Sequence, residues 1–315
     1  MIMDSIIYVA PVIAIVLIGY LSIRFKLLSS DVADGLAGFV FNIALPAYIF
    51  RTIVRWGIPK DLTNTWELFA SYYAGALIIL LIAMLISRYA FEGTQAEQSM
   101  FGVGASHSNI VLLGLPVALY VLGSKLTLPI LLIVATHGVV MALLLGVVLR
   151  IRMGKSGEIF TAIGQTLLDH LKNPVLIALI AGVLYAAFDA PKVPKEVDTV
   201  LSLLGRATVP CALFAMGGML VRYKIHGNLA PAVAVCAIKL AAFPAIVYAL
   251  AKPLFGLPMS WVWVVVVLAA MPTSFNMHKL MKRSQRGSEA SSTAIALSTV
   301  LSAVGIVVLG YIMRN

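Results

Sequence analysis

SHSNIVLLGLPVAL, residues 106–119, lies within an apolar run long enough to cross a lipid bilayer, yet it opens with four residues whose side chains form hydrogen bonds. Gly114 and Pro116 follow shortly afterwards. In lipid, backbone groups that leave a helix need polar partners, so irregular backbone at mid-depth persists only where protein or a polar cavity satisfies it. The stretch therefore predicts a transmembrane helix that unwinds at residues 106–109.

The composition of the whole chain places it in a membrane. Its 315 residues are 61% hydrophobic and 11% charged, and the mean hydropathy is +1.00, values outside the range of ordinary soluble domains. The formal charge of +10 would suggest a nucleic-acid partner in a soluble protein, but nearly all Lys and Arg residues fall at segment ends or in loops, where they set topology. We therefore expect the lipid bilayer as a partner, and no nucleic acid.

Ten apolar runs have the length of about 20 residues that a helix needs to cross the bilayer core. We expect an all-α integral membrane protein with ten transmembrane helices, and we keep the first run as a span rather than a signal peptide. With the N-terminus outside, the inner loops carry more Lys and Arg than the outer loops, so both termini are expected outside. The expected spans are residues 5–25, 32–54, 66–89, 99–122, 126–149, 167–188, 197–221, 229–250, 261–281 and 289–313.

Landmarks of the first half of the chain recur in the second half at a nearly fixed offset. Asp34 corresponds to Asp198, and Pro46 to Pro210, both at 164 residues. Because a unit of five spans is odd, a second copy must enter the membrane upside down relative to the first. The sequence thus predicts a 5+5 inverted repeat, an architecture of secondary transporters whose substrate site lies near the midplane, where broken helices meet.

The same offset carries Ser108 onto Pro272, within AAMPTSFNMHKL, residues 269–280. Pro272 lacks an N–H group and its ring disrupts the preceding turn, so carbonyl groups near Ala269 lose their helical partners. Thr273 and Asn276 can supply polar partners for such groups. We therefore expect a second broken helix at the same depth as the first.

The two expected repeats are residues 1–152 and 153–315, and each contains one break. The pair of breaks suggests a binding site. Crossed breaks would bring two half-helix N-termini to the centre of the protein, where their partial positive charge suits an anion. The alternative is structural, because proline kinks are common in membrane helices and Ser and Asn side chains join neighbouring helices. The coincidence of both polar patches in the repeat frame favours the anion site.

Four stretches carry a resemblance to a known family: FNIALPAYIF (residues 41–50), SNIVLLGLPVA (108–118), AAMPTSFN (269–276) and ASSTAIALSTVLS (290–302). They resemble the auxin efflux carrier family, which includes plant PIN-type exporters and bacterial carriers for malonate, malate and similar carboxylates. The resemblance extends over essentially the whole chain. Each stretch is weak by itself, and together they are fairly specific.

The resemblance implies a scaffold of spans 1, 2, 6 and 7, a mobile transport domain of spans 3–5 and 8–10 with spans 4 and 9 crossed, elevator-like movement, and a homodimer through the scaffold. Asn109 matches the crossover asparagine that contacts the substrate carboxylate in PIN-type members, and Pro272 matches the crossover proline. Plant members have proline where this chain has Ser108. The short loop at residues 150–166 is typical of the bacterial type, so we expect a bacterial inner membrane.

Seven residues are candidates for contact with substrate: Ser108, Asn109, His137, Lys239, Pro272, Thr273 and Asn276. An amide at a helix break can donate to a carboxylate, although Asn109 could equally cap the half-helix. Lys239 places a full charge inside span 8. Because a charge inside the bilayer costs much free energy, such a residue is by default expected to have a function. It could pair with an anionic substrate, act as a built-in cation, or snorkel to the nearer surface.

His137 lies in the middle of its span and could sense or relay a proton. The simpler interpretation is a structural histidine whose hydrogen bonds are all made within the core. Arg206, in span 7, is expected to make a structural bond rather than a substrate contact. All 13 Asp and Glu residues fall at segment ends or in gaps, which disfavours a carboxylate that carries an ion through the membrane.

The sequence therefore predicts a secondary transporter for a small organic anion, such as a mono- or dicarboxylate or an auxin-like acid. It has no Walker A motif, no H-E-x-x-H and no nucleophile elbow, so we expect no enzyme activity, no metal site and no cofactor; a coupled H⁺ or Na⁺ stays unresolved. The alternatives are a ligand-responsive membrane sensor, for which the loops are short, and a bile-acid-type sodium symporter, which would need acidic residues near its ion sites.

Overall fold

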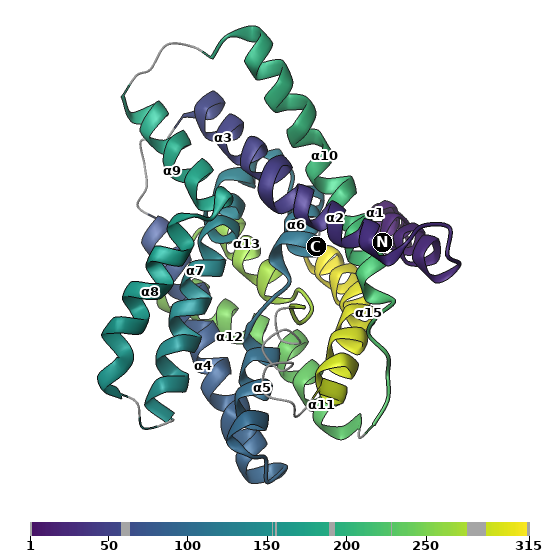
Figure 1. Cartoon of the computed structure of the whole chain (residues 1–315), viewed down its shortest axis with the longest axis vertical. Helices are drawn as coiled ribbons and strands as arrows, with labels where there is room; N and C mark the ends of the chain where they lie inside the picture. Colours follow the sequence, from purple (N-terminus) through teal and green to yellow (C-terminus); the bar gives the residue numbers. More distant parts are fainter. Residues whose placement is uncertain are drawn as a thin grey trace.

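The structure is a computed structural model that describes residues 2–57, 64–152, 154, 156–188, 193–227, 229–275 and 288–313. In this part of the chain the elements are all helical and no strand occurs (Figure 1). In chain order they are α1 (Ile2–Arg24), α2 (Ser30–Phe39), η1 (Val40–Ala44), α3 (Leu45–Trp56), α4 (Thr65–Ala90), α5 (Gln95–Ser106), η2 (Ile110–Gly114), α6 (Leu115–Leu122), η3 (Ser124–Leu126), α7 (Thr127–Arg152), η4 (Ser156–Glu158), α8 (Ile159–Leu171), α9 (Pro174–Ala187), α10 (Lys195–Leu220), α11 (Leu229–Ala237), η5 (Ile238–Ala242), α12 (Phe243–Ala249), η6 (Leu250–Leu254), α13 (Met259–Ala269) and α15 (Ser288–Ile312).

Within the described residues, six continuous helical segments are long and apolar enough to cross a membrane: Ser30–Trp56, Thr65–Ala90, Ser124–Arg152, Lys195–Leu220, Leu229–Leu254 and Ala290–Ile312. The bent pair of α8 and α9 adds a seventh if it is one span. The other three expected spans contain shorter apolar helices, namely Val9–Arg24, Ile110–Leu122 and Met259–Ala269. The all-helical class is therefore confirmed, whereas the count of ten spans stays a prediction.

Proline accounts for a repeated irregularity in these segments. A π-helical turn comes directly before an α-helix whose second residue is proline at three places: η1 before Pro46, η2 before Pro116 and η5 before Pro244. Proline has no N–H group, and its ring crowds the carbonyl of the preceding turn. A π-turn widens the helix at that point and lets the chain continue in one direction.

The sixth expected span, residues 167–188, is not one straight helix. Its first residues belong to α8, which meets α9 at an angle of 74°. The side chain of Asn173 accepts a hydrogen bond from the backbone N–H of Val175 at 2.9 Å, and Pro174 is the first residue of α9. An asparagine cap followed by proline at the first helical position begins a new helix, so the chain turns a corner there.

Helices α1 and α10 lie against each other with their backbones in contact. A Cβ atom on Gly217 of α10 would lie 1.9 Å from the carbonyl oxygen of Val16 in α1, and one on Gly19 would lie 2.2 Å from the carbonyl oxygen of Phe214. Real Cβ atoms do not approach backbone so closely. Glycine at these two positions therefore allows α1 and α10 to pack as one unit.

Two ion pairs join α10 and the residues just after it to the helical segment Ser30–Trp56, which contains α2 and α3. Arg51 of α3 donates to Asp198 near the start of α10, and Arg222, just after α10, donates to Asp34 of α2 at 2.9 Å and 2.6 Å. The hydrogen bonds to Asp34 raise the pKa of the Arg222 guanidinium above its usual value. In Figure 1, α3, α9 and the first turns of α10 lie together at one end of the molecule, and α4, α5 and α11 reach the other end.

Candidate functional site at the two helix breaks

The first break lies where the polar stretch at residues 106–109 predicts it. Helix α5 ends at Ser106, and His107 follows in an extended conformation with φ −92° and ψ 104°. Asn109 is also outside helical space, with φ −79° and ψ 69°, and η2 begins at Ile110. Residues 106–110 are all buried. The expected unwinding of this helix is therefore confirmed.

The second break lies at Pro272. Helix α13 ends at Ala269, and the chain continues without helical structure through Thr273 to Ser274. Thr273 is fully buried. Asn276, which we expect to take part in the site, lies outside the described residues, as does the start of any half-helix that follows the break.

The backbones of the two breaks pair with each other. Ser108 and Thr273 form an isolated antiparallel bridge. The N–H of Asn109 donates to the carbonyl oxygen of Pro272 at 2.8 Å, and the N–H of Ser274 donates to the carbonyl oxygen of His107 at 2.9 Å. Each break thus supplies partners for backbone groups that the other has removed from its helix, which is the condition for irregular backbone at membrane depth.

Thr273 adds two further bonds. Its hydroxyl donates to the carbonyl oxygen of Gly104 in α5 at 2.8 Å, and its N–H donates to the hydroxyl oxygen of Ser298 in α15 at 3.2 Å. In an unbroken helix that N–H would donate to Ala269, four residues earlier. The Ala269 carbonyl therefore needs another donor, as the position of Pro272 predicts.

Lys239 is that donor. Its side chain comes from η5 and is 0% exposed. The ammonium donates to the carbonyl oxygen of Ala269 and to the hydroxyl of Ser108, both at 2.6 Å. It also lies 4.4 Å from the centroid of the Phe243 ring, a cation–π contact that favours a desolvated charge. Lys239 therefore does not snorkel to a surface; it lies between the two breaks and bonds to both.

The side chain of Asn109 does not cap η2. Its amide nitrogen instead lies 3.1 Å from the sulfur of Met216 in α10. A thioether is a weak acceptor, so this bond to a described residue can be replaced by a bond to a stronger acceptor. The capping role left open for Asn109 is not observed.

Two buried histidines lie beside the first break. His107 Nδ1 and His137 Nε2 are 3.4 Å apart, and the rings meet edge to face with centroids 4.7 Å apart. His137 also contacts the rings of Tyr72 and Tyr73. Its Nδ1 atom makes no hydrogen bond to any described residue, although buried polar atoms are normally paired. His137 is thus a buried polar group next to the site and incompletely satisfied by it.

Several contacts of the site could not be read from the sequence. Met216 and the Gly104 carbonyl have apolar or backbone chemistry that carries no signal in a single chain. Arg206 is exposed on α10 and bonds to no described residue, so the structural bond expected there is not observed. Among the described residues there is no cluster of three His, Cys, Asp or Glu that could hold a metal ion.

The helical fold and the paired breaks define a class: a multi-pass membrane protein with polar, irregular backbone inside its helical core. The family model described as "Membrane transport protein" matches residues 4–309, so the chain belongs to this family, the auxin efflux carrier family. Its members and the relatives below are described as transporters rather than enzymes, apart from one described as a signaling protein.

Three relatives indicate the range of the family. The chain is 28% identical over 313 residues to a protein of Rhizobium meliloti (strain 1021) described as "Putative malonate transporter", covering 98% of this chain and 95% of that protein. It is 26% identical over 232 residues to "Uncharacterized transporter YfdV" of Escherichia coli (strain K12), covering 69% and 68%. It is 26% identical over 215 residues to "Lysosomal cholesterol signaling protein" of Mus musculus, covering 64% of this chain and 24% of that protein.

Proposed function

We propose that this protein is a secondary carrier that moves a small organic anion, such as a mono- or dicarboxylate or an auxin-like acid, and that the anion binds where the two helix breaks meet. The observation that carries the proposal is the Lys239 ammonium, fully buried and bonded to Ser108 and Ala269. Its partners are a hydroxyl and a carbonyl, neither of which neutralises its charge. A bound carboxylate would supply the missing negative charge.

The surrounding groups suit the same ligand. The first turn of η2 presents backbone N–H groups and the partial positive charge of a helix N-terminus. The Asn109 amide lies beside it, and its one partner among the described residues is a sulfur. Among the described residues, the buried charged and polar side chains are Lys, His, Ser, Thr, Asn and Gln, with no carboxylate. Such an environment favours an anion over a cation.

The architecture that we propose is ten spans in two inverted repeats, residues 1–152 and 153–315. Helix packing supports it: α1 lies along α10 as α9 lies along α3, which is the reciprocal arrangement expected when span 1 corresponds to span 6 and span 7 to span 2. The ion pairs support it too, since the repeat-related Asp34 and Asp198 each bind an arginine of the opposite repeat.

The transport cycle that we propose is an elevator movement. The scaffold would contain α1, α2, α3, α9 and α10, in spans 1, 2, 6 and 7, and the transport domain the spans that hold both breaks. The contact between Asn109 and Met216 lies at the border between the two parts. A weak N–H to sulfur contact can be given up at low cost when one part slides past the other, which supports a border at this place.

The setting that we propose is a bacterial inner membrane, with both termini on the outer side and a homodimer formed through the scaffold helices. The balance of basic residues between loops supports the orientation. Moving one charge across 100 mV is worth about 2.3 kcal/mol, so a monoanion could leave a negative interior without a coupled ion. Uptake would need H⁺ or Na⁺, and the pair of His107 and His137 is the only proton-exchanging cluster that we find in the described core.

Flux in proteoliposomes tests the proposal. Radiolabelled malonate, malate and indole acetate are supplied at imposed membrane potentials and pH gradients, with empty liposomes as the control. We expect saturable flux of at least one acid, with a dependence on potential that reports the charge moved. Flux equal to that of empty liposomes for all three acids would contradict the proposal.

One relative favours a second candidate, a ligand-responsive membrane sensor, because the protein of Mus musculus is described as a signaling protein. That protein is much longer, since the match covers 24% of it. Binding of an acid without any flux would favour the sensor. A bile-acid-type sodium symporter would instead show flux that requires Na⁺, for which the described core offers no carboxylate.

A further inference from the structure

A cavity of about 540 Å³ opens between the ends of α3 and α9 and the first turns of α10. A neighbouring cavity of about 370 Å³ lies between α3 and the start of α7 and shares Arg51 and Arg55 with it. We call the two together the α3–α10 cavity. None of its lining residues belongs to the helix breaks, so it is a separate feature from the proposed transport site.

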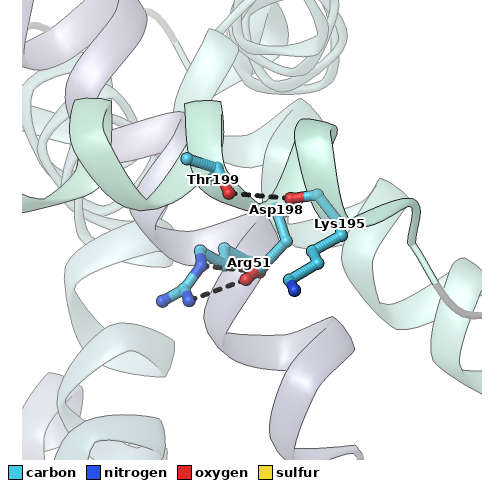
Figure 2. A network of polar contacts seen from close by, with 4 residues as sticks. All are labelled: Arg51, Lys195, Asp198 and Thr199. Carbon is cyan, nitrogen blue, oxygen red and sulfur yellow. Dashed lines mark hydrogen bonds and ion pairs between the residues drawn. The ribbon is translucent and has the colours of Figure 1, made fainter.

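The charge of the described lining residues is unbalanced. Among them, three cations, Arg51, Arg55 and Lys195, accompany one carboxylate, Asp198, which is an excess of two positive charges. Arg51 Nε donates to Asp198 Oδ1 at 2.7 Å and Arg51 Nη2 donates to Oδ2 at 3.0 Å, a bidentate pair (Figure 2). The charged groups of Arg55 and Lys195 form no ion pair with any described residue.

The two cations without an ion-pair partner among the described residues line the same end of the cavity from two different helices. Arg55 lies one helical turn after Arg51 on α3, and Lys195 lies about one turn before Asp198 on α10. Because α3 ends where α10 begins, both lie beyond the bidentate pair in the same direction, and Figure 2 shows Lys195 and Asp198 extending from α10 toward α3. An anion bound between these two helices would meet the guanidinium of α3 and the ammonium of α10.

The remaining wall is apolar. Phe50 and Tyr185 meet edge to face with ring centroids 5.8 Å apart, and Val54 and Leu201 complete this surface. A lining with a few convergent charges and an aromatic wall is the usual form of a small-molecule site. It suits a ligand that has a charged head and a hydrocarbon body better than it suits an inorganic ion.

We propose that the α3–α10 cavity binds an organic oxyanion, a carboxylate or phosphate group with an apolar body, through Arg55 and Lys195. The arginine fork recognises carboxylate and phosphate by the same planar geometry, and the bond of Arg51 to Asp198 is an internal example of it. The ligand is either a soluble carboxylate or the headgroup of an anionic phospholipid. This site goes beyond the proposed transport function and does not depend on it.

The test treats the full-length protein with an acetylating reagent and follows the labelling of Lys195 by mass spectrometry. The labelling of the exposed Lys172 is the internal control. One arm compares malonate with sodium chloride at equal ionic strength in neutral detergent. The other compares nanodiscs of phosphatidylcholine with nanodiscs that also contain phosphatidylglycerol. We expect several-fold slower labelling of Lys195, with Lys172 unchanged, in malonate, in phosphatidylglycerol, or in both; the responding arm identifies the source of the oxyanion.

Variants show whether the cavity itself is responsible. Arg55→Gln should abolish the protection, whereas Arg88→Gln, which removes the same charge at an exposed position on α4, should retain it. Lys239→Met should also retain it, which separates this site from the transport site. If Arg55→Gln does not fold, modification of Arg55 by phenylglyoxal in the unaltered protein gives the same answer. Equal labelling in every condition, or protection that survives Arg55→Gln, would overturn the proposal.

Discussion

The ammonium of Lys239 donates a hydrogen bond over 2.6 Å to the carbonyl oxygen of Ala269. That carbonyl ends α13, and the break at Pro272 has removed its helical partner. The same ammonium bonds to Ser108 in the other break. One buried lysine therefore bonds to both interruptions of the membrane helices, at the place where we propose that the acid binds.

Lys239→Met should reduce anion flux to near the background of empty liposomes. The substitution keeps an unbranched side chain but leaves the Ala269 carbonyl and Ser108 without their donor, and one unsatisfied buried group costs about 1–3 kcal/mol. Flux in proteoliposomes and thermal unfolding in detergent measure the two effects. Lys252→Met is the matched control, because Lys252 makes only a 3.5 Å contact to Leu257. Unaltered flux from a folded Lys239→Met protein would remove Lys239 from the site.

Asn109→Ala should lower flux and weaken substrate binding with little loss of stability. Among the described residues the amide donates only to the weak acceptor Met216, so its removal should cost the folded protein little, whereas a substrate carboxylate would lose a donor. Flux and malonate titration of the purified protein test both parts. Asn42→Ala, which removes a bond to Gly38 within one helical segment, is the control. A large loss of stability with normal flux would assign Asn109 a structural role instead.

Thr273→Val should destabilise the protein by about 1–3 kcal/mol, because the isosteric valine leaves the buried carbonyl of Gly104 without its donor. Thr299→Val is the control, since the Thr299 hydroxyl donates to Ile295 of its own helix. Denaturant or thermal unfolding of both variants gives the comparison. Equal stability of the two variants would mean that the Thr273 hydroxyl does not hold the breaks together.

Gly217→Ala should destabilise the protein by about 1–3 kcal/mol, the usual cost of overpacking. The new methyl group would meet the backbone of Val16, which cannot move without shifting α1. Gly138→Ala is the control, because a Cβ atom there meets nothing within 4 Å. The yield of monodisperse protein and its unfolding temperature measure the difference. If both variants behave alike, α1 and α10 do not pack as closely as described.

Local chemistry made the breaks predictable from the sequence. A proline or a run of hydrogen-bonding side chains disrupts a helix within one or two turns of its own position. The interruptions at residues 106–109 and at Pro272 could therefore be predicted without any knowledge of packing. The corner between α8 and α9 carried a readable signal too, because Asn173 followed by Pro174 is a helix start. The bounds of the expected span at residues 167–188 followed hydropathy alone and took no account of this signal, so the bend at Asn173 was not foreseen, whereas a single span there stays a prediction.

Long-range contacts were not predictable in the same way. Lys239 could be recognised as an intramembrane charge, but its bond to Ala269 depends on how α12 packs against α13. The contact between Asn109 and Met216 joins residues 107 positions apart, and methionine carries no distinguishing signal. The role of Asn276 stays a prediction, because it lies outside the described residues.

Counterflow of radiolabelled malonate tests the central claim most directly. Proteoliposomes loaded with unlabelled malonate are diluted into a trace of labelled malonate, and the label inside is followed with time for the unaltered protein and for Lys239→Met. We predict a transient accumulation of label with the unaltered protein that is lost in the variant. Accumulation of the same size in both proteins would contradict the account of the site, and no accumulation in either, with malate and indole acetate equally inactive, would contradict the account of the function.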